Sequence, residues 1–341
     1  MPVFHDAPIP SNRTVIVLMA SLIAVSLGAV ARAQTSLDDV HIVANANAVP
    51  GIAARSGAMD VSGLHLIKTD VNLVLVPVSV TDLQERIVTG LQPENFQIFE
   101  DKEPQEIRNF SAEDVPVTIG IILDTSGSMQ DKIDRVREAV MEFCENANPQ
   151  DEFFLISFSE QPRLMTDFTD TPDKVEAELP FLLPKGRTAL LDAIYLGLDK
   201  MKHARHSKKA LLIISDGGDN HSRHGEKAVR AAAKESDVMV YTIGIFDRFV
   251  ATEEEMQGPS LLSDIAESSG GRSFTLENPN DLPAIAHRIG MELRTQYVLA
   301  YRPQSAAHDG RWRKIKVRLR LPGKHSPFQT HSRSGYYAMA R

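Results

Sequence analysis

The chain of 341 residues has few means of cross-linking itself, because it contains one cysteine, Cys144. A single cysteine excludes an intramolecular disulfide, so the fold must depend on its hydrophobic core. An excess of positive charge is also missing. The formal net charge is -8, which argues against nucleic acid as a partner. With 43% hydrophobic and 24% charged residues, the composition is that of a globular protein, and its length indicates more than one domain.

Charged residues are absent from Thr14 to Ala31, directly after Arg13. A positive flank, an apolar run and small residues spaced for cleavage are typical of a secretory signal peptide, expected here over residues 1–33. The run is long enough that an uncleaved membrane anchor remains the alternative. We therefore expect an exported protein, periplasmic or secreted, that meets a membrane only if this segment is retained. Residues 34–63, rich in Ala, Asn, Gly and Ser, are expected to be a linker.

Apolar strand-like runs alternate with helical patterns across residues 116–294. The expected strands are Val117–Leu123, Phe153–Phe158, Ala210–Ile214 and Val238–Ile245. Apolar residues at helical spacing between them include Ile133, Val136, Val140 and Phe143, and then Leu190, Leu191, Ile194 and Leu198. Strands that are hydrophobic on both faces and alternate with helices predict a doubly wound, mostly parallel, Rossmann-like α/β domain.

Two β-rich segments, residues 64–115 and 295–341, flank this region. In the first, Pro77 within "VNLVLVPVSVTD" indicates an edge strand or a bulge, and a polar turn at Asp101–Pro104 indicates a hairpin. In the second, "WRKIKVRLRL" alternates apolar and cationic residues, as a half-buried strand does. Neither segment can easily form a core alone, so we expect one β-sandwich-like module into which the α/β domain is inserted.

Oxygen-bearing side chains follow two of the expected α/β strands. "DTSGSM" places Asp124, Ser126 and Ser128 at the end of the first strand, and "SDGGDN" places Asp216 at the end of another. Thr188 opens the helix predicted between them, a position that favours small hydroxyls. In an open α/β sheet, ligands bind beyond the carboxyl ends of the strands. Hard divalent cations prefer oxygen ligands, so this set predicts a metal site at that edge, with Asp216 acting through metal-bound water.

The order Asp124-x-Ser126-x-Ser128, then Thr188, then Asp216 resembles the metal-ion-dependent adhesion site of von Willebrand factor type A domains. The resemblance covers Val117 to about Arg294, and all five positions match. It implies a Mg²⁺ or Mn²⁺ ion held by these residues, with an Asp or Glu carboxylate of a protein partner as the remaining ligand.

The flanking segments are similar to bacterial proteins related to the type A domain that were first grouped in Acidobacteria. The similarity includes "FEDKEPQEIRNF" and the terminal "RSGYYA". It says little about activity, because that group is poorly characterised.

The leading hypothesis is thus a non-enzymatic, exported adhesion protein that captures an acidic partner residue through the cation. An assembly or chaperone-adaptor role beside an ATPase is the alternative, although a signal peptide argues against it. A serine hydrolase is a further alternative, but Ser126 lacks the glycines two residues away on each side that a nucleophile turn requires.

Two other groups of residues are interpreted as ordinary surface features. Asp219, His221 and His224 do not complete a calcium loop, so they are expected to form a polar rim near the main site. The last 47 residues contain ten Lys and Arg against Asp309 alone. This is more typical of an exposed strand face than of a polyanion site, although lipopolysaccharide or nucleic acid remains the alternative.

Overall fold

The computed structural model describes residues 73–246, 253–304, 309–321 and 328–338. The predicted signal peptide and linker lie outside these residues. No helix in the described ranges has the length and apolar character needed to cross a membrane.

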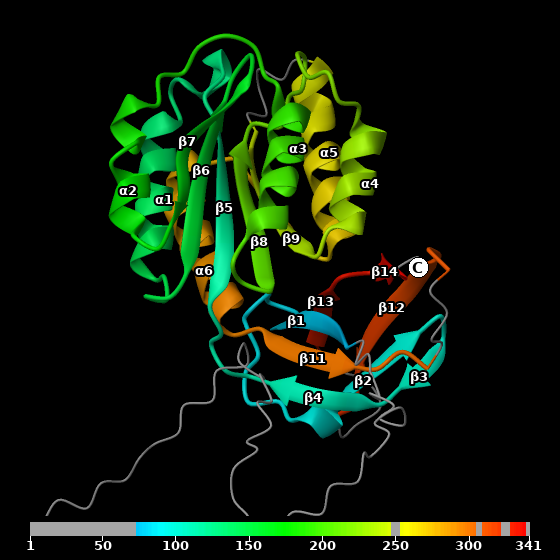
Figure 1. The fold of residues 1–341 in the computed structure, drawn as a ribbon. Helices are drawn as coiled ribbons and strands as arrows, with labels where there is room; N and C mark the ends of the chain where they lie inside the picture. Colours follow the sequence, from blue (N-terminus) through cyan, green and yellow to red (C-terminus); the bar gives the residue numbers. More distant parts are fainter. Residues whose placement is uncertain (1–72, 247–252, 305–308, 322–327, 339–341) are drawn as a thin grey trace, which may run out of the picture. The chain divides into compact units, whose positions relative to one another are not determined.

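A six-stranded sheet forms the centre of the α/β part, with strand order β10-β9-β8-β5-β6-β7 (Figure 1). Neighbouring strands are parallel except for β7, which runs antiparallel to β6 at one edge. The strands are β5 (Val117–Asp124), β6 (Glu152–Phe158), β7 (Pro162–Thr169), β8 (Lys208–Ser215), β9 (Val238–Ile245) and β10 (Ser273–Leu276). The four predicted strands are β5, β6, β8 and β9, and the mostly parallel sheet is confirmed.

Helices cover both faces of this sheet (Figure 1). They are α1 (Ile133–Glu145), α2 (Pro172–Glu176), α3 (Leu190–Lys200), α4 (Glu226–Glu235), α5 (Glu253–Ser269) and α6 (Leu282–Arg294). Ile121 of β5 packs in the core with α1 and α6, whereas its neighbour Ile122 packs in the core with α3, α4 and α5. Because every residue of β5 is buried, its sequence is a nearly continuous apolar run.

Short 3-10 turns connect several of these elements. They are η1 (Pro93–Asn95), η2 (Gly127–Met129), η3 (Leu179–Phe181), η4 (Met201–His203) and η5 (Pro279–Asp281).

Two four-stranded sheets form the remainder, with orders β13-β1-β11-β4 and β14-β12-β2-β3. Their strands are β1 (Val74–Asp82), β2 (Phe96–Glu100), β3 (Glu103–Gln105), β4 (Ile107–Ser111), β11 (Tyr297–Tyr301), β12 (Trp312–Leu319), β13 (Phe328–Ser332) and β14 (Gly335–Tyr337). Each sheet combines strands that precede and follow the α/β part. Residues of both sheets share one core, in which Val76 and Leu299 join Ile98 and Val317. The α/β part is therefore inserted into a β-sandwich-like module, as the sequence predicts.

The placement of Pro77 corrects one expectation in part. Strand β1 lies between β13 and β11, so it is not an edge strand. Its pairing with β13 begins only at Val78, however, and Pro77 pairs with Val298 of β11 alone. The proline thus occupies the half of β1 that is unpaired on one side, where a missing N–H group removes no ladder hydrogen bond.

The hairpin predicted in the first flanking segment is confirmed. Strands β2 and β3 pair antiparallel on either side of Asp101 and Lys102. Both residues have positive φ angles, 47° and 80°, which match the right-handed twist of the paired strands.

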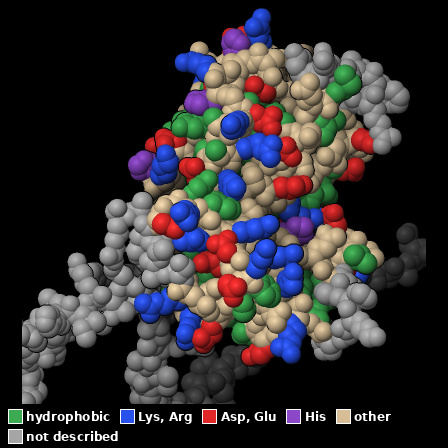
Figure 2. All heavy atoms as spheres, turned by 90° about the vertical axis from the view of Figure 1, so that its right-hand side faces the viewer, with side chains coloured by type: hydrophobic (Ala, Val, Ile, Leu, Met, Phe, Trp, Pro, Cys, Tyr) green, Lys and Arg blue, Asp and Glu red, His purple; other side chains and the backbone are tan. Residues whose placement is uncertain are grey.

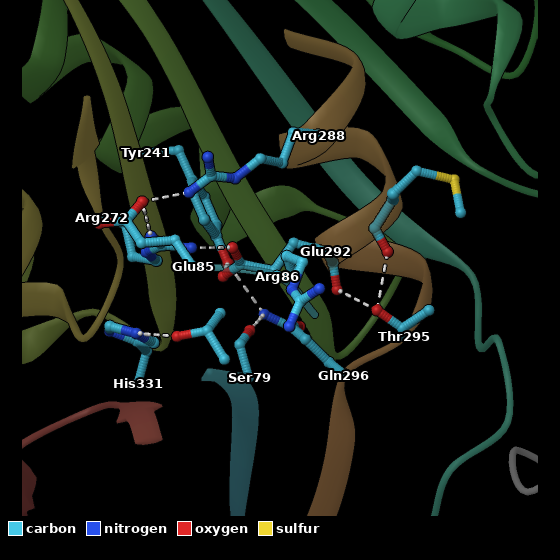
Figure 3. Close-up of polar contacts among 12 residues, drawn as sticks. Ser79, Glu85, Arg86, Tyr241, Arg272, Arg288, Glu292, Thr295, Gln296 and His331 are labelled. Atoms are coloured by element: carbon cyan, nitrogen blue, oxygen red, sulfur yellow. Dashed lines mark hydrogen bonds and ion pairs between the residues drawn. The ribbon is translucent and has the colours of Figure 1, made fainter. Parts of the chain in front are cut away.

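Polar contacts, most of them between buried side chains, join the α/β part to the sandwich (Figure 3). Arg272, just before β10, donates to Glu292 of α6 at 2.7 Å and to Glu85 of the sandwich at 2.9 Å. Gln296 donates to Ser79 of β1 at 3.1 Å and to Tyr241 of β9 at 3.0 Å. These contacts lie where both chain connections between the two parts also run.

The cationic strand β12 behaves as the alternation predicts. Ile315 and Val317 are buried, and Lys314 and Lys316 are exposed. Figure 2 shows positive and negative side chains interleaved on the face that it draws, without one continuous basic patch.

Candidate functional site

The carboxyl ends of β5 and β8 place the predicted metal-site residues at the edge of the sheet that faces away from the β-sandwich (Figure 1). Asp124 is the last residue of β5, and Asp216 directly follows the last residue of β8. The two strands are adjacent and parallel, with Leu123 opposite Ile214. Their parallel register therefore brings the two carboxylates to one edge.

The Asp124 carboxylate is fully buried and accepts hydrogen bonds at both oxygens. Its Oδ1 accepts from the backbone N–H of Ser126 at 2.8 Å. Its Oδ2 accepts from the hydroxyl of Ser215, the last residue of β8, at 2.6 Å. These bonds fix the turn after β5 against the neighbouring strand.

The two serines of the turn lie side by side. The hydroxyl oxygens of Ser126 and Ser128 are 3.1 Å apart, on either side of Gly127. The N–H of Gly127 donates to the carbonyl of Gly186 at 3.1 Å, and the N–H of Lys185 donates to the carbonyl of Thr125 at 2.8 Å. The loop that leads to Thr188 therefore lies directly against the serine turn.

Thr188 is buried and links this loop to the one after Asp216. Its N–H donates to the Asn220 side chain at 3.0 Å, and its carbonyl accepts from the N–H groups of Asn220 and His221. The expectation that its hydroxyl caps the next helix is wrong, because α3 begins at Leu190 with Ala189 in the capping position. No hydrogen bond among the described residues uses that hydroxyl, so it is available to another ligand.

Asp216 is buried and has a neighbour that sequence reasoning missed. The ammonium group of Lys132, at the start of α1, lies 3.2 Å from its Oδ2. Burial, followed by the negative charge of Asp216, raises the pKa of Asp124 to about 7. Without a bound cation, this environment favours the neutral form of the Asp124 carboxyl.

The donor set fits a hard divalent cation. Two carboxylates and three hydroxyls belong to adjoining loops, and oxygen atoms are the ligands that Mg²⁺ and Mn²⁺ prefer. The described part of the chain has no group of three or more His, Cys, Asp and Glu side chains placed to hold a metal. A site here would therefore depend on its hydroxyl groups.

The polar rim predicted around Asp219 lies along the start of α3. Asp219 accepts from the N–H of Leu191 at 3.2 Å and from the Ser222 hydroxyl at 2.6 Å. The His224 ring contacts Asp192 at 2.6 Å and stacks on Tyr195, with ring centroids 4.0 Å apart. These side chains are engaged in holding the loop after β8 against α3.

The arrangement defines a class of protein: a doubly wound α/β domain with a hydroxyl-rich polar site at the carboxyl edge of its sheet. Residues 119–218 match the family model of the von Willebrand factor type A domain. The α/β part of this chain therefore has the fold of a von Willebrand factor type A domain.

One curated relative is the bovine (Bos taurus) inter-alpha-trypsin inhibitor heavy chain H4, which is 25% identical over 135 residues. That match spans 35% of this chain and 15% of the relative.

Solved structures with a similar fold include a von Willebrand factor type A protein from Catenulispora acidiphila, at 15% identity and a TM-score of 0.49. That match covers 80% of this chain and 64% of the other. The corresponding domain of the type V pilus tip protein Mfa5 from Porphyromonas gingivalis is 15% identical, with a TM-score of 0.42, over 52% of this chain and 95% of that one. At such low similarity, the function must be argued from the residues of this chain.

Proposed function

We propose that this protein is a non-enzymatic binding protein whose type A domain grips an acidic side chain of a protein partner through a bound Mg²⁺ or Mn²⁺ ion. Asp124, Ser126, Ser128 and Thr188 would hold the ion, and Asp216 would hold its water molecules. When bound, the ion supplies an electrophilic position that a partner carboxylate can occupy. The apolar run near the N-terminus supports export, to the periplasm or beyond the cell.

The observation that carries this proposal is the burial of Asp124 beside Asp216. Two carboxylates that share a buried site repel each other unless a cation lies near them. Lys132 supplies one positive charge, but of the two carboxylates it contacts only that of Asp216. The Ser126 hydroxyl lies beside the other carboxylate and 3.1 Å from the Ser128 hydroxyl, and hydroxyls can coordinate a cation without cancelling its charge.

Hydrolysis at Ser126 has less support. Its hydroxyl lies beside that of Ser128, and no histidine contacts it within the described ranges. A nucleophilic serine needs a general base within hydrogen-bond reach.

Isothermal titration with Mg²⁺ and with Mn²⁺ tests the proposal on the full chain. The Asp124→Asn variant keeps the shape of the side chain and removes its charge, so we expect it to lose binding. Asp131→Asn is the matched control, because it removes an exposed charge from the same loop and lies outside the proposed ligand set. Equal affinity in wild type and Asp124→Asn would refute the proposal.

A further inference from the structure

The segment that leads to Thr188 exposes two large apolar side chains. Phe181 and Leu183 are 70% and 68% exposed, more than any other large hydrophobic residue that the structure describes. Between and before them, Leu182 and Leu179 are buried in the core on the α1 side of the sheet. The segment therefore alternates between residues that anchor it and residues that point into solvent.

The backbone of this segment is fixed. The Arg137 side chain on α1 donates to the carbonyl of Leu179 at 3.0 Å and to that of Leu182 at 2.8 Å. Two residues after Leu183, the N–H of Lys185 is bonded to Thr125 in the serine turn. The exposed apolar side chains thus lie two and four residues from a backbone contact with the serine turn.

Two cations continue the same surface. Lys185 and Arg187 are exposed, and neither side chain has an acidic partner among the described residues. Elsewhere in the described structure, many Lys and Arg side chains pair with acids, as Arg137 does with Asp134. Unpaired cations beside a predicted metal ion favour a partner with several negative charges.

We propose that Phe181, Leu183, Lys185 and Arg187 form a specificity surface for a protein segment that combines the coordinating carboxylate with an apolar side chain and further acidic residues. This inference rests on the proposed function, since it describes which carboxylate-bearing partner the same site selects. The ion would take any accessible carboxylate, whereas the surface discriminates among them. Phenylalanine and arginine are both enriched at protein interfaces, and Phe181 and Arg187 supply them here.

Selection of short random peptides displayed on phage, with Mg²⁺ present, tests the inference on the full chain. We expect enriched peptides to carry Asp or Glu together with Leu, Ile or an aromatic residue within a few positions, and to lose binding when Mg²⁺ is chelated. The Phe181→Ser/Leu183→Ser variant should bind such a peptide about 10- to 100-fold more weakly, equivalent to about 1.4 to 2.8 kcal/mol. Leu83→Ser is the matched control, because Leu83 is 66% exposed but belongs to the sandwich.

Titration of Mg²⁺ separates the two proposals. Unchanged Mg²⁺ affinity in Phe181→Ser/Leu183→Ser, with weakened peptide binding, supports the specificity surface. Peptide binding that is equal in wild type and variant overturns it while leaving the metal site intact, and absent Mg²⁺ binding in wild type overturns the proposed function itself. Enrichment of acidic peptides without apolar residues also overturns the surface.

A membrane or a second copy of this chain could cover the apolar pair instead, and comparing wild type with Phe181→Ser/Leu183→Ser tests both. If wild type but not the variant sediments with phosphatidylglycerol vesicles, the apolar pair serves a membrane, and the protein-partner inference is wrong. If wild type self-associates by analytical ultracentrifugation and the variant does not, the occupant is a second copy of this chain, and the inference is equally wrong.

Discussion

Replacing Arg272 should destabilise the protein far more than replacing a surface arginine. The Arg272 side chain is 7% exposed and its partner Glu292 is 1% exposed, with 2.7 Å between the bonded atoms. Glu292 also accepts from the Tyr241 hydroxyl at 3.0 Å (Figure 3). Arg272→Met would leave the carboxylate buried without a countercharge, which costs about 3–5 kcal/mol.

Arg230 offers a matched comparison. It pairs with Asp264 and Glu226, but its side chain is 43% exposed. Exposed ion pairs contribute about 0–1 kcal/mol, so Arg230→Met should have a small effect. Urea unfolding followed by circular dichroism measures both variants, and the difference between them should be about 2–5 kcal/mol in unfolding free energy.

A double variant shows whether Arg272→Met lowers the unfolding free energy through the lost ion pair or through lost packing. If the uncompensated charge of Glu292 causes the damage, Arg272→Met/Glu292→Leu should be more stable than Arg272→Met alone, because buried ion pairs can be exchanged for apolar pairs at little cost. A double variant no more stable than Arg272→Met, or an Arg272→Met effect as small as that of Arg230→Met, would refute this reasoning.

Five further predictions concern the predicted metal site and the core. Because the folded pKa of Asp124 is raised to about 7, Mg²⁺ should bind more weakly as pH falls below about 7, by up to about tenfold per unit in calorimetric titrations. Without metal, the raised pKa of Asp124 adds to the unfolding free energy at low pH; this contribution is complete below pH 3.8 and is lost as pH rises through about 7. Asp124→Asn removes the titrating group, so its unfolding free energy, measured by urea unfolding, should change less over this pH range than that of wild type. Lys132→Met should strengthen Mg²⁺ binding, measured by calorimetry, since the ammonium contacts a carboxylate of the site; weaker binding would contradict this competition. Burial raises the pKa of Cys144 to about 12, so iodoacetamide should alkylate the native protein much more slowly than the unfolded chain, as followed by mass spectrometry. Gly120→Ala would place a methyl group 2.2 Å from a core ring and should cost about 1–3 kcal/mol or more in urea unfolding. Gly225→Ala meets nothing within 4 Å and should cost only about 1 kcal/mol, because Gly225 is the N-cap of α4 and alanine is a poorer cap than glycine.

The central strands could be predicted because burial on both faces leaves a plain pattern. Strand β5 is apolar almost throughout, and it ends at the first residue with a charged side chain, Asp124. Strand β7 was missed because it is an edge strand whose residues are mostly exposed or half-buried. Strands β10 and β13 were missed because they have only four and five residues and, unlike β2 and β3, neither pairs with a neighbouring strand across a short polar turn.

The predicted site residues could be chosen from their order along the chain, but their partners could not. Ser215 lies 91 residues from the carboxylate to which it donates, and Lys132 lies 84 residues from Asp216. Arg272 and Glu85 are 187 residues apart. Such pairings depend on which strands become neighbours, and local patterns carry no information about that.

The topology separates the attachment to the sandwich from the predicted metal site. Strand β4 ends at Ser111 and β5 begins at Val117, while α6 ends at Arg294 and β11 begins at Tyr297. Both connections to the sandwich therefore leave from the amino edge of the parallel sheet, where the Arg272 contacts lie, and the carboxyl edge stays free of them. Since substitutions at distant sites act independently, changes at Asp124 should leave the Arg272 contacts undisturbed, and changes at Arg272 should lower stability without altering the affinity for Mg²⁺.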